Sequence, residues 1–405
     1  MAVIFLPRQA RADFPTIEAA IQRARTQALV VSEAQAELGV ARSQLTSARV
    51  SSLGNPYSEI QVDRPFTDGT QGRDVGREVQ AMTWNYFPLD IAGQRGKRIS
   101  EAERLIEWRT LGLVDARALA AGDVVAVYGE LVVSWSRVDE ASQGESTARE
   151  EAKYFQGRFE AKDTTLYEKS LAEAEIARWV QARTEAELRV VSARARFGQL
   201  TGIGDPDKPP ANIGILPPPL RGVWDVAQIA RVVDRAPVIS RLLAEKTYWS
   251  ASIERYEREK YPPVAFELIA GRGSLGEARF GAGAVITVPV TRRYQGEIAR
   301  AESGVASAMQ RLDLLRRVVT VRLHAAREAL QSVTRALEEL DKNGIPALER
   351  GVSSSLEGFR AGKIDLSRAM LARRDLATGR ARRLDLVEAA WRAYAELALF
   401  NDGLP

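Results

Sequence analysis

The sequence predicts a mainly α-helical protein that contains a few β-strands and is built from two structural repeats. The first observation is an internal echo: FEAKDTTLYEKSLAEAEI begins at Phe159, and the similar FRAGKIDLSRAMLARRDL begins at Phe359, 200 residues further on. The second is a composition dominated by Ala, Arg, Glu and Leu with only 7% aromatic residues, which is typical of long helices and coiled coils. The third is the heptad spacing of apolar residues in the longest helical patterns. Self-similarity at a fixed period indicates a repeat architecture.

The first repeat covers residues 16–202 and begins with a helix. Thr16 is a good N-cap for a helix that runs to about residue 53, where the sequence Gly-Asn-Pro would stop it. The composition then changes. Strands are predicted within residues 57–91. The segment alternates in polarity, is rich in Val, Thr and aromatic side chains, and contains a Gly- and Asp-rich turn.

A very long helix is expected next, from about residue 97 to 159, followed by a return helix from about residue 165 to 200. Some 60 residues at 1.5 Å each span on the order of 90 Å, far more than an ordinary globular helix. The polar turn between the two helices, within residues 159–166, is the first hairpin tip. The 4, 3, 4, 3 spacing of a coiled-coil seam is present at Val124, Tyr128, Leu131, Trp135 and Val138.

A Pro- and Gly-rich linker at residues 203–222 separates the first repeat from the second, which covers residues 223–405. The order of elements then repeats. The expected segments are a helix over 223–260, strands within 262–291, a long helix over 297–360, a hairpin tip within 359–366 and a last helix that ends near Phe400. Gly344-Ile345-Pro346 predicts a kink within the long helix, because proline removes a backbone hydrogen bond.

Composition excludes several kinds of site. The chain has no cysteine, so it has no disulfide, no thiolate metal site and no cysteine nucleophile. Its one histidine, His324, cannot alone make a transition-metal site, and no Gly-rich phosphate loop has the required spacing. No catalytic residue, cofactor or metal site is therefore expected, and the protein is not expected to be an enzyme. The net charge of +4 arises from 57 basic and 53 acidic residues that are interleaved, which does not favour a nucleic-acid partner.

Two features bear on export and on membranes. The most apolar run, residues 124–135, contains Gly129 and Glu130 and is shorter than the ~20 residues of a transmembrane helix. At the N-terminus, Ala10-Arg11-Ala12 has the A-x-A form of a signal-peptidase site behind a short apolar run. Residues 1–15 are therefore predicted to be the remnant of an export signal.

The long seams and the few strands both favour oligomerisation. Helices of this length cannot bury both faces within one chain, and four strands per chain cannot form a closed sheet without exposed edges. Several chains together would combine their helices into a tube and their strands into a barrel. Trp84, Tyr86 and Phe87 are candidates for an aromatic belt at a membrane interface.

Several motifs spread over the chain are shared with a known family. They are NPYSEIQV, the paired junctions FPLDIAGQRGKRISEAE and ITVPVTRRYQGEIARAE, the stretch GFRAGKIDLSRAMLARRDL, and the helix ends QLTG and FNDG. With these motifs the chain resembles the TolC-like outer-membrane efflux proteins, the outer-membrane factors of tripartite export systems, over nearly all of residues 16–403. The two junctions are most similar to the branch that serves heavy-metal cation pumps.

This resemblance implies a homotrimer in the outer membrane of a Gram-negative bacterium. Four strands from each chain would form a twelve-stranded β-barrel on a long periplasmic α-helical coiled-coil tube. The linker and the termini would belong to an equatorial collar. The implied partners are a periplasmic adaptor protein, an inner-membrane pump of the resistance-nodulation-division type or similar, and outer-membrane lipid. The implied function is an exit duct for metal cations or small toxic compounds.

The same resemblance places the two hairpin tips against the adaptor. Gly362 permits a left-handed turn, while Thr164 or Thr165, and Asp365, can cap the returning helices. The phenylalanine of each tip can hold its turn in place by packing. The residues expected to contact the adaptor are Phe159, Lys162, Thr165, Leu166, Phe359, Gly362, Lys363, Ile364, Asp365 and Leu366.

Members of the family narrow the pore near the tips, often with acidic rings, because a trimer presents each carboxylate three times. Asp365 and Asp375 are the gate candidates. Asp365 can also act as a helix cap, and the neighbouring Arg373 and Arg374 can neutralise Asp375. Two alternatives stay open: an exit channel for type I secretion, and a soluble periplasmic coiled-coil scaffold without a pore.

Overall fold

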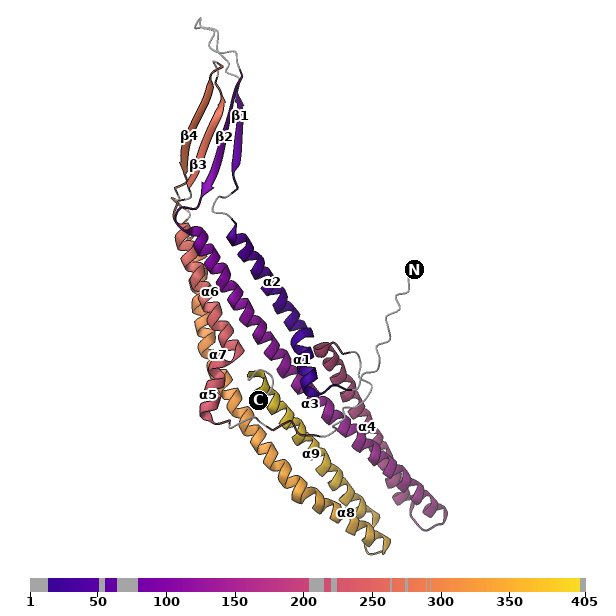
Figure 1. The fold of residues 1–405 in the computed structure, drawn as a ribbon. Helices are drawn as coiled ribbons and strands as arrows, with labels where there is room; N and C mark the ends of the chain where they lie inside the picture. Colours follow the sequence, from indigo (N-terminus) through magenta and orange to yellow (C-terminus); the bar gives the residue numbers. More distant parts are fainter. Residues whose placement is uncertain are drawn as a thin grey trace, which may run out of the picture. The chain divides into compact units, whose positions relative to one another are not determined.

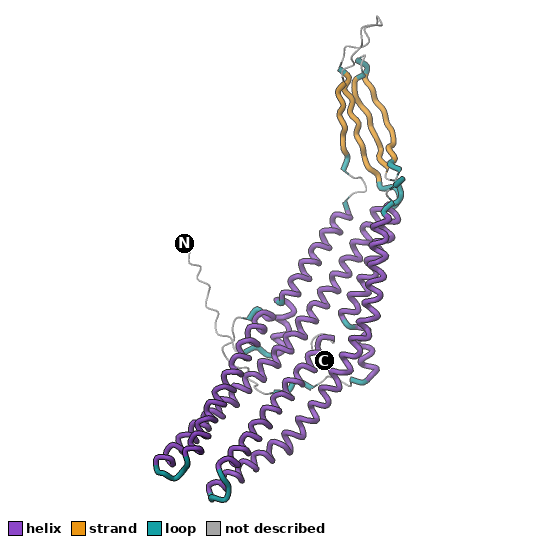
Figure 2. Tube along the Cα trace, turned by 180° about the vertical axis from the view of Figure 1, so that it is seen from behind, coloured by secondary structure: helices purple, strands orange, loops and turns teal. Residues whose placement is uncertain are grey.

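A computed structural model shows long helices and one four-stranded sheet within the residues that it describes (Figures 1 and 2). The described residues are 14–50, 55–63, 79–203, 215–219, 224–262, 264–273, 276–288, 290–291 and 293–400. Most of the predicted signal remnant, much of the linker and the predicted stop after Phe400 lie outside them. The mainly helical class with a minority of strands is confirmed.

The first helix of each repeat is divided in two. Thr16 caps α1 (Ile17–Gln27) as predicted, and its hydroxyl accepts a hydrogen bond from Ala19 N at 3.3 Å. The backbone is then extended at Ala28, and α2 (Leu29–Arg49) follows, where one helix over 16–53 was expected. In the second repeat α5 (Val226–Arg235) ends at Ala236, because a residue before proline avoids the helical region, and α6 (Pro237–Glu259) begins directly after it.

The remaining elements follow the predicted order. The first repeat continues with β1 (Tyr57–Asp63), β2 (Gln80–Leu89), α3 (Gln94–Glu160) and α4 (Leu166–Thr201). The second continues with β3 (Val264–Arg272), β4 (Ala278–Ile286), α7 (Gln295–Glu339), α8 (Ile345–Arg360) and α9 (Leu366–Phe400). The irregularity expected at Gly344-Ile345-Pro346 is present as a π-helical segment, η1 (Leu340–Gly344), between α7 and α8.

The chain divides into two compact units, each of which contains parts of both sequence repeats. One comprises Met1–Gln35, Leu113–Ile239 and Leu315–Pro405, and is called the hairpin unit here. The other comprises Ala36–Gly112 and Ser240–Leu314, and is called the sheet unit.

In the sheet unit, aromatic and ionic contacts join the helices. Trp108 of α3 stacks on Tyr248 of α6 with ring centroids 5.2 Å apart. Buried Glu101 on α3 accepts a hydrogen bond from Arg255 Nη1 on α6 at 2.6 Å. Trp249 on α6 packs against Gly304 of α7, where an added Cβ would lie 2.5 Å from the indole ring, so the close approach requires glycine.

The four strands of the sheet unit form one antiparallel sheet in the order β1-β2-β3-β4. The two strands of each repeat are neighbours, and β2 of the first repeat pairs with β3 of the second. Among the described strands, β1 and β4 are therefore edges that are paired on one side only. An unpaired edge presents a row of free backbone donors and acceptors.

In the hairpin unit, α3 with α4 and α8 with α9 form two helical hairpins that end next to each other (Figure 2). At the end of the hairpins away from the tips, the core is built around Trp391 of α9. Its ring lies 5.7 Å from Tyr128 of α3, and its Nε1 donates to Ile215 O at 2.8 Å. Gly129 of α3 lies directly against Trp391 and leaves no room for a Cβ.

One stretch of α3 is long and apolar enough to span a membrane by length and composition, although the sequence analysis excluded such a run. Most of that stretch is buried inside the protein. Val124, Val125 and Leu131 are fully buried there, and their hydrophobicity serves the core.

Candidate functional site

The two hairpin tips share one backbone geometry. Lys162 (φ 59°) and Gly362 (φ 67°) adopt the left-handed conformation at equivalent positions. In each tip three consecutive amides donate hydrogen bonds back to the preceding helix. In the first tip, the amides of Ala161, Lys162 and Asp163 donate to the carbonyls of Gly157, Phe159 and Arg158, at 3.0, 3.0 and 2.8 Å respectively. In the second tip, the amides of Ala361, Gly362 and Lys363 donate to the carbonyls of Glu357, Phe359 and Gly358, at 2.9, 2.9 and 2.8 Å respectively. The left-handed turn predicted at Gly362 is confirmed, and Lys162 adopts it without the conformational freedom of glycine.

Side chains cap the helices that leave the tips. At α4, Thr165 Oγ1 accepts from Glu168 N at 3.2 Å and Glu168 Oε2 accepts from Thr165 N at 3.1 Å, which forms a capping box. The Thr164 hydroxyl also donates to Glu168. The hydrogen bond from Thr164, followed by those from Thr165, holds the pKa of Glu168 below its ordinary value. At α9, Asp365 Oδ1 accepts from Arg368 N at 3.0 Å, so Asp365 caps the helix as predicted.

A hydrophobic cluster joins the two hairpins near the tips. The rings of Phe155 and Phe359 lie 6.0 Å apart in it, so Phe359 packs beside its turn as expected. Phe159 instead lies beneath Lys169, whose Nζ is 5.2 Å from the ring centroid. The cluster consists of the buried Ala152, Phe155, Ala172, Leu366 and Met370, with Leu171, Ile176 and Phe359 packed against it.

The equivalent leucines of the two tips differ in exposure. Leu166 is 62% exposed, whereas Leu366 is 5% exposed inside the cluster. Leu366 is therefore not available for the adaptor contact that the sequence analysis expected of it. Among the other expected contact residues, Phe159, Phe359 and Ile364 are half-buried, and the exposed ones are Lys162, Thr165, Gly362, Lys363 and Asp365.

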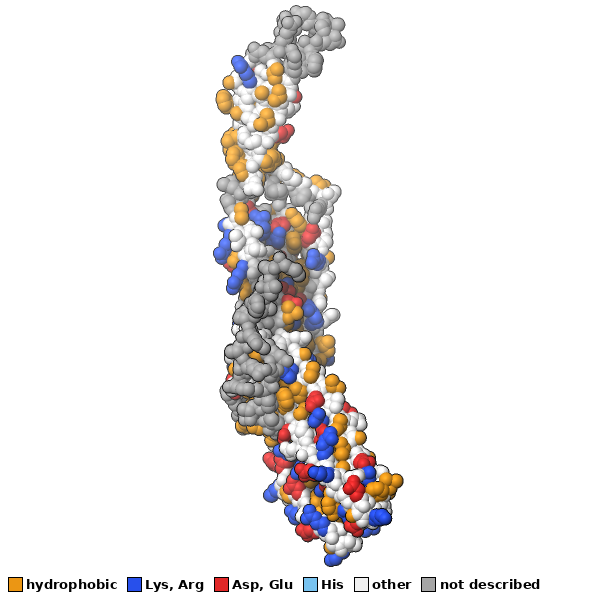
Figure 3. All heavy atoms as spheres, turned by 90° about the vertical axis from the view of Figure 1, so that its right-hand side faces the viewer, with side chains coloured by type: hydrophobic (Ala, Val, Ile, Leu, Met, Phe, Trp, Pro, Cys, Tyr) orange, Lys and Arg blue, Asp and Glu red, His pale blue; other side chains and the backbone are white. Residues whose placement is uncertain are grey.

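Two exposed aromatic residues close to the first tip were missed by the sequence analysis. Tyr154 is 56% and Tyr167 is 67% exposed. The sequence feature that could have identified them is an aromatic residue within two helical turns of a predicted hairpin tip. Acidic, basic and hydrophobic side chains alternate over the hairpin end of the molecule (Figure 3).

The gate candidates Asp365 and Asp375 are both exposed. The two arginines beside Asp375 pair with other carboxylates: Arg373 forms an ion pair with Glu151 on α3, and Arg374 Nε donates to Glu175 Oε1 on α4 at 3.0 Å. The expected neutralisation of Asp375 by these arginines is therefore corrected. Burial lowers the pKa of Arg373.

The two ion pairs, Arg373–Glu151 and Arg374–Glu175, are called the latch here, because they join α9 to the first hairpin. Glu175 is 7% exposed and also accepts from Arg178 Nη1 at 3.0 Å. The latch lies in a groove of about 750 Å³ between the hairpins. Sequence patterns did not reveal the latch, because its members are far apart in the chain and isolated charges on helices are common.

The strand register separates the three residues proposed for the aromatic belt. Trp84 pairs with Glu59 and Tyr86 with Glu267, so both share one face of the sheet with these carboxylates. Side chains alternate along a strand, which places Phe87 on the opposite face. The three residues therefore do not form one belt. The face of Phe87 is mainly apolar: it includes the exposed Ile60, Phe266, Leu268 and Phe280, together with the polar Ser58, Asn85 and Arg272.

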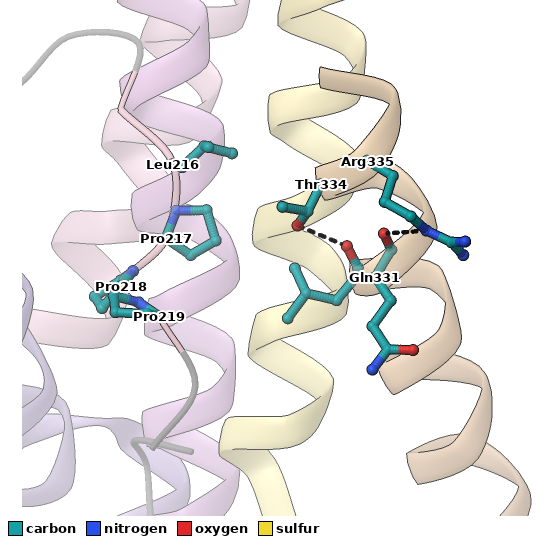
Figure 4. Close-up of a pocket in the computed structure, with 8 residues that line it drawn as sticks. Leu216, Pro217, Pro218, Pro219, Gln331, Thr334 and Arg335 are labelled. Carbon is teal, nitrogen blue, oxygen red and sulfur yellow. Dashed lines mark hydrogen bonds between the residues drawn. The ribbon is translucent and has the colours of Figure 1, made fainter. Parts of the chain in front are cut away.

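A second pocket, of about 710 Å³, lies between the Pro-rich segment and α7 (Figure 4). Leu216 to Pro219 line one side, while Leu330, Gln331, Thr334 and Arg335 line the other. None of the predicted site residues takes part in it. Within the described residues no group of three or more His, Asp and Glu side chains could hold a metal ion.

No family model matches the chain. In sequence it is 23% identical over 389 residues to the cobalt-zinc-cadmium resistance protein CzcC of Cupriavidus metallidurans, with 96% of this chain and 90% of CzcC covered. It is 22% identical to the nickel-cobalt-cadmium resistance protein NccC of Alcaligenes xylosoxydans xylosoxydans, covering 70% of this chain and 63% of NccC. The structure matches the CmeC outer membrane channel of Campylobacter jejuni with a TM-score of 0.78 and 14% identity, over 96% of this chain and 86% of CmeC.

The predicted resemblance is confirmed by these comparisons together with the paired hairpins and the four-stranded sheet. The chain has the fold of the TolC-like outer-membrane channels and is related in sequence to the metal-resistance proteins CzcC and NccC.

Proposed function

We propose that this chain is the outer-membrane channel subunit of a tripartite efflux system. Three copies form an exit duct across the periplasm and the outer membrane. An inner-membrane pump delivers substrate to the duct through a periplasmic adaptor. The fold and the two metal-resistance relatives support this function.

The single observation that supports a membrane channel best is the sheet. One face is mainly apolar, while the other presents Glu59, Glu267 and Arg279 beside Trp84 and Tyr86. This alternation is that of an outer-membrane barrel, with an apolar face toward lipid and a polar face toward the lumen. Among the described strands, β1 and β4 are each paired on one side only, and three chains would supply the twelve strands that close the sheet.

Exposed apolar side chains on the helices support assembly of several chains. On α7, Leu314, Val318 and Val321 are 55%, 39% and 67% exposed and follow the 4, 3 spacing of a coiled-coil seam. On α4, Leu188 and Val191 are 64% and 61% exposed. Contiguous exposed apolar surface marks interaction sites, and neighbouring chains of the tube would cover these two stripes.

The hairpin tips are the proposed adaptor contact. The turns expose Lys162 and Lys363, and the first tip adds exposed Leu166 and Tyr167. A mixture of cationic and apolar exposed groups suits a protein partner, which can satisfy both. At the gate, Asp375 is the better candidate, because Asp365 already caps α9.

The proposed cargo is metal cations, or otherwise small toxic compounds. CzcC and NccC are named for resistance to cobalt, zinc, nickel and cadmium. An exit duct need not bind its cargo. Passage of cations therefore requires a wide polar lumen but does not require a metal-ligand cluster.

The proposal is tested by purifying the chain in detergent and reconstituting it in a planar bilayer. A trimer by light scattering and discrete conductance steps are expected. A species that stays soluble and monomeric without detergent, and gives no conductance, would contradict the channel and favour a scaffold. For the cargo, a strain lacking the gene should grow less well in cobalt, zinc or cadmium salts, and the gene should restore growth.

A further inference from the structure

The polar face of the sheet carries aromatic rings that lie between carboxylates. Tyr57 of β1 and Tyr86 of β2 stack with ring centroids 4.6 Å apart and an interplanar angle of 19°. In the same row, Tyr86 pairs with Glu267 of β3, and the two side chains are hydrogen bonded. Two residues along the strands, Trp84 pairs with Glu59. Paired side chains on one face have Cβ atoms about 5 Å apart, so these five residues form one continuous surface, called the aromatic patch here.

The aromatic patch is open to a ligand. Each of its members is exposed or half-buried. The adjoining strand β4 adds no bulk beside it, because Gly281 and Gly283 stand on the same face, opposite Ile269 and Glu267. An added Cβ at Gly283 would lie 2.9 Å from Glu267 Oε2, so this carboxylate lies over the glycine. Larger side chains on β4 would fill the space next to the carboxylate.

The sheet does not neutralise the two carboxylates of the patch. Among the described strand residues, Arg279 is the one cationic side chain on this face, and it pairs with Glu277 at 2.5 Å. Glu59 and Glu267 have no ion-pair partner within the part of the chain that the structure describes. Two negative charges beside three aromatic rings are therefore left for a cation from outside the chain.

These residue types suit an organic ammonium cation better than a metal ion. A divalent metal ion gives up water only for several oxygen, nitrogen or sulfur ligands, which the face of a ring does not supply. The described residues hold no group of three or more metal-ligating side chains. An alkylated ammonium is attracted to the faces of aromatic rings, and a carboxylate next to the rings balances its charge.

We propose that the aromatic patch is a low-affinity binding site for organic ammonium cations. The rings of Tyr86 and its neighbours contact the alkyl groups, while Glu59 or Glu267 faces the charge. The role of the site in export rests on the proposed function, in which the polar face lines the lumen and a trimer presents the patch three times. Weak binding suits a duct, because its cargo must leave as well as enter.

The site is tested on the full chain purified in dodecyl maltoside, a detergent without an ammonium group. Tetramethylammonium is the probe, and tert-butanol is its uncharged counterpart of similar size. Saturation-transfer nuclear magnetic resonance reports the binding of each small molecule. Tetramethylammonium is expected to bind saturably and tert-butanol to give a much weaker signal. Equal saturable binding of both would show apolar adsorption alone and would overturn the proposal.

Tyr86→Ala and Phe87→Ala form a matched pair, because adjacent residues of β2 point to opposite faces. Loss of one exposed cation–π contact is expected to raise the dissociation constant of tetramethylammonium about 2- to 5-fold in Tyr86→Ala. Phe87→Ala should leave it unchanged, and Tyr86→Phe, which keeps the ring, should retain binding. Equal losses in the two alanine variants, or none in Tyr86→Ala, would overturn the site.

A variant without carboxylates tests the site even if Tyr86→Ala does not fold. Glu59→Gln combined with Glu267→Gln keeps the size of both side chains and is expected to weaken binding about 2- to 5-fold at low ionic strength. Unchanged binding in this variant would contradict a cation site. Zinc and magnesium chlorides should compete with tetramethylammonium equally, by screening alone. Much stronger competition by zinc would assign the patch to metal ions and overturn the proposal.

Conductance of the same preparation in a planar bilayer separates this inference from the proposed function. Channels that conduct but bind no tetramethylammonium would remove the ammonium site and leave the proposed function intact. Binding that responds to the variants as expected, in a preparation without conductance, would keep the site and remove the channel.

Discussion

Lys162 is strained at the position where the second tip has glycine. A left-handed backbone costs a non-glycine residue roughly 1–2 kcal/mol. Lys162→Gly is therefore expected to raise the local opening free energy of the first tip by about 1 kcal/mol, offset in part by the flexibility of glycine in the unfolded chain. Gly362→Ala is expected to lower that of the second tip by about 1–2 kcal/mol, since nothing within 4 Å would block its Cβ and only the backbone is strained.

Hydrogen exchange at the tip amides measures both changes. Gly157→Ala serves as the control, because this glycine lies in α3 without a positive φ and with open space around it. Alanine should stabilise the helix there. Destabilisation by Gly157→Ala comparable to that of Gly362→Ala would contradict the explanation from backbone strain.

Glu168 makes the start of α4 sensitive to acid. Hydrogen bonds from Thr164 and Thr165 hold its folded pKa below the unfolded value. Such a carboxylate stabilises the fold above its unfolded pKa, and the stabilisation is lost as the pH falls through the folded pKa. Fraying of the first turn of α4 is therefore expected below about pH 4.5. Hydrogen exchange of that turn, corrected for intrinsic rates, should show this acid sensitivity, and Glu168→Gln should abolish it while retaining a capping amide.

Local sequence rules identify residues whose partners are local. Thr16, Thr165, Asp365 and Gly362 have the predicted backbone roles, because caps and left-handed turns depend on neighbours within four residues. The burial of Leu366 and the latch depend on packing between hairpins about 200 residues apart, which no local pattern encodes. The aromatic belt failed for another reason: Tyr86 and Phe87 are adjacent, and adjacent strand residues point to opposite faces.

At the scale of elements, the latch is an ionic link between the hairpins beside the hydrophobic cluster. Glu175→Gln removes the charge that both Arg178 and Arg374 share in a nearly buried position. Because Arg374 is partly exposed, a loss of about 1–3 kcal/mol is expected, below that of a fully buried pair. Glu349→Gln is the matched control, since its pair with Arg380 is exposed and should contribute less than about 1 kcal/mol.

Hydrogen-exchange protection of α9 near Arg374 measures the difference. Faster exchange in Glu175→Gln than in Glu349→Gln is expected. Equal protection in the two variants would show that the Glu175 charge does not help to hold the hairpins together.

The order and type of the elements could be predicted because the repeat supplies two copies of every pattern. Interruptions of the helices could be predicted only where the sequence contains a helix-breaking proline or glycine. Proline marks the π-segment and also begins α6, although one helix was expected there. At Ala28 no glycine or proline is present, and an unbroken apolar periodicity concealed the division between α1 and α2.

At the scale of the whole molecule, the exposed apolar stripe on α7 predicts where neighbouring chains touch. Val321 is 67% exposed and lies near the middle of α7, a helix that would form part of the tube. Val321→Glu would bury an unpaired carboxylate at each interface between neighbouring chains, which is expected to weaken each by about 2–5 kcal/mol. Gln331→Glu is the control, because it adds the same carboxylate at an exposed polar position on another face of the same helix.

Light scattering in detergent, together with the temperature at which the oligomer dissociates on a mild gel, measures the effect. Val321→Glu should dissociate at lower temperature or lower detergent concentration than the unmodified chain, while Gln331→Glu should not. Loss of the oligomer should also affect the sheet. Among the described strands β1 and β4 are each paired on one side only, and the proposed trimer would pair their free edges. Aggregation of the dissociated Val321→Glu chain is therefore expected. A Val321→Glu oligomer as stable as the control would mean that this stripe faces lumen or solvent, and that other surfaces close the tube.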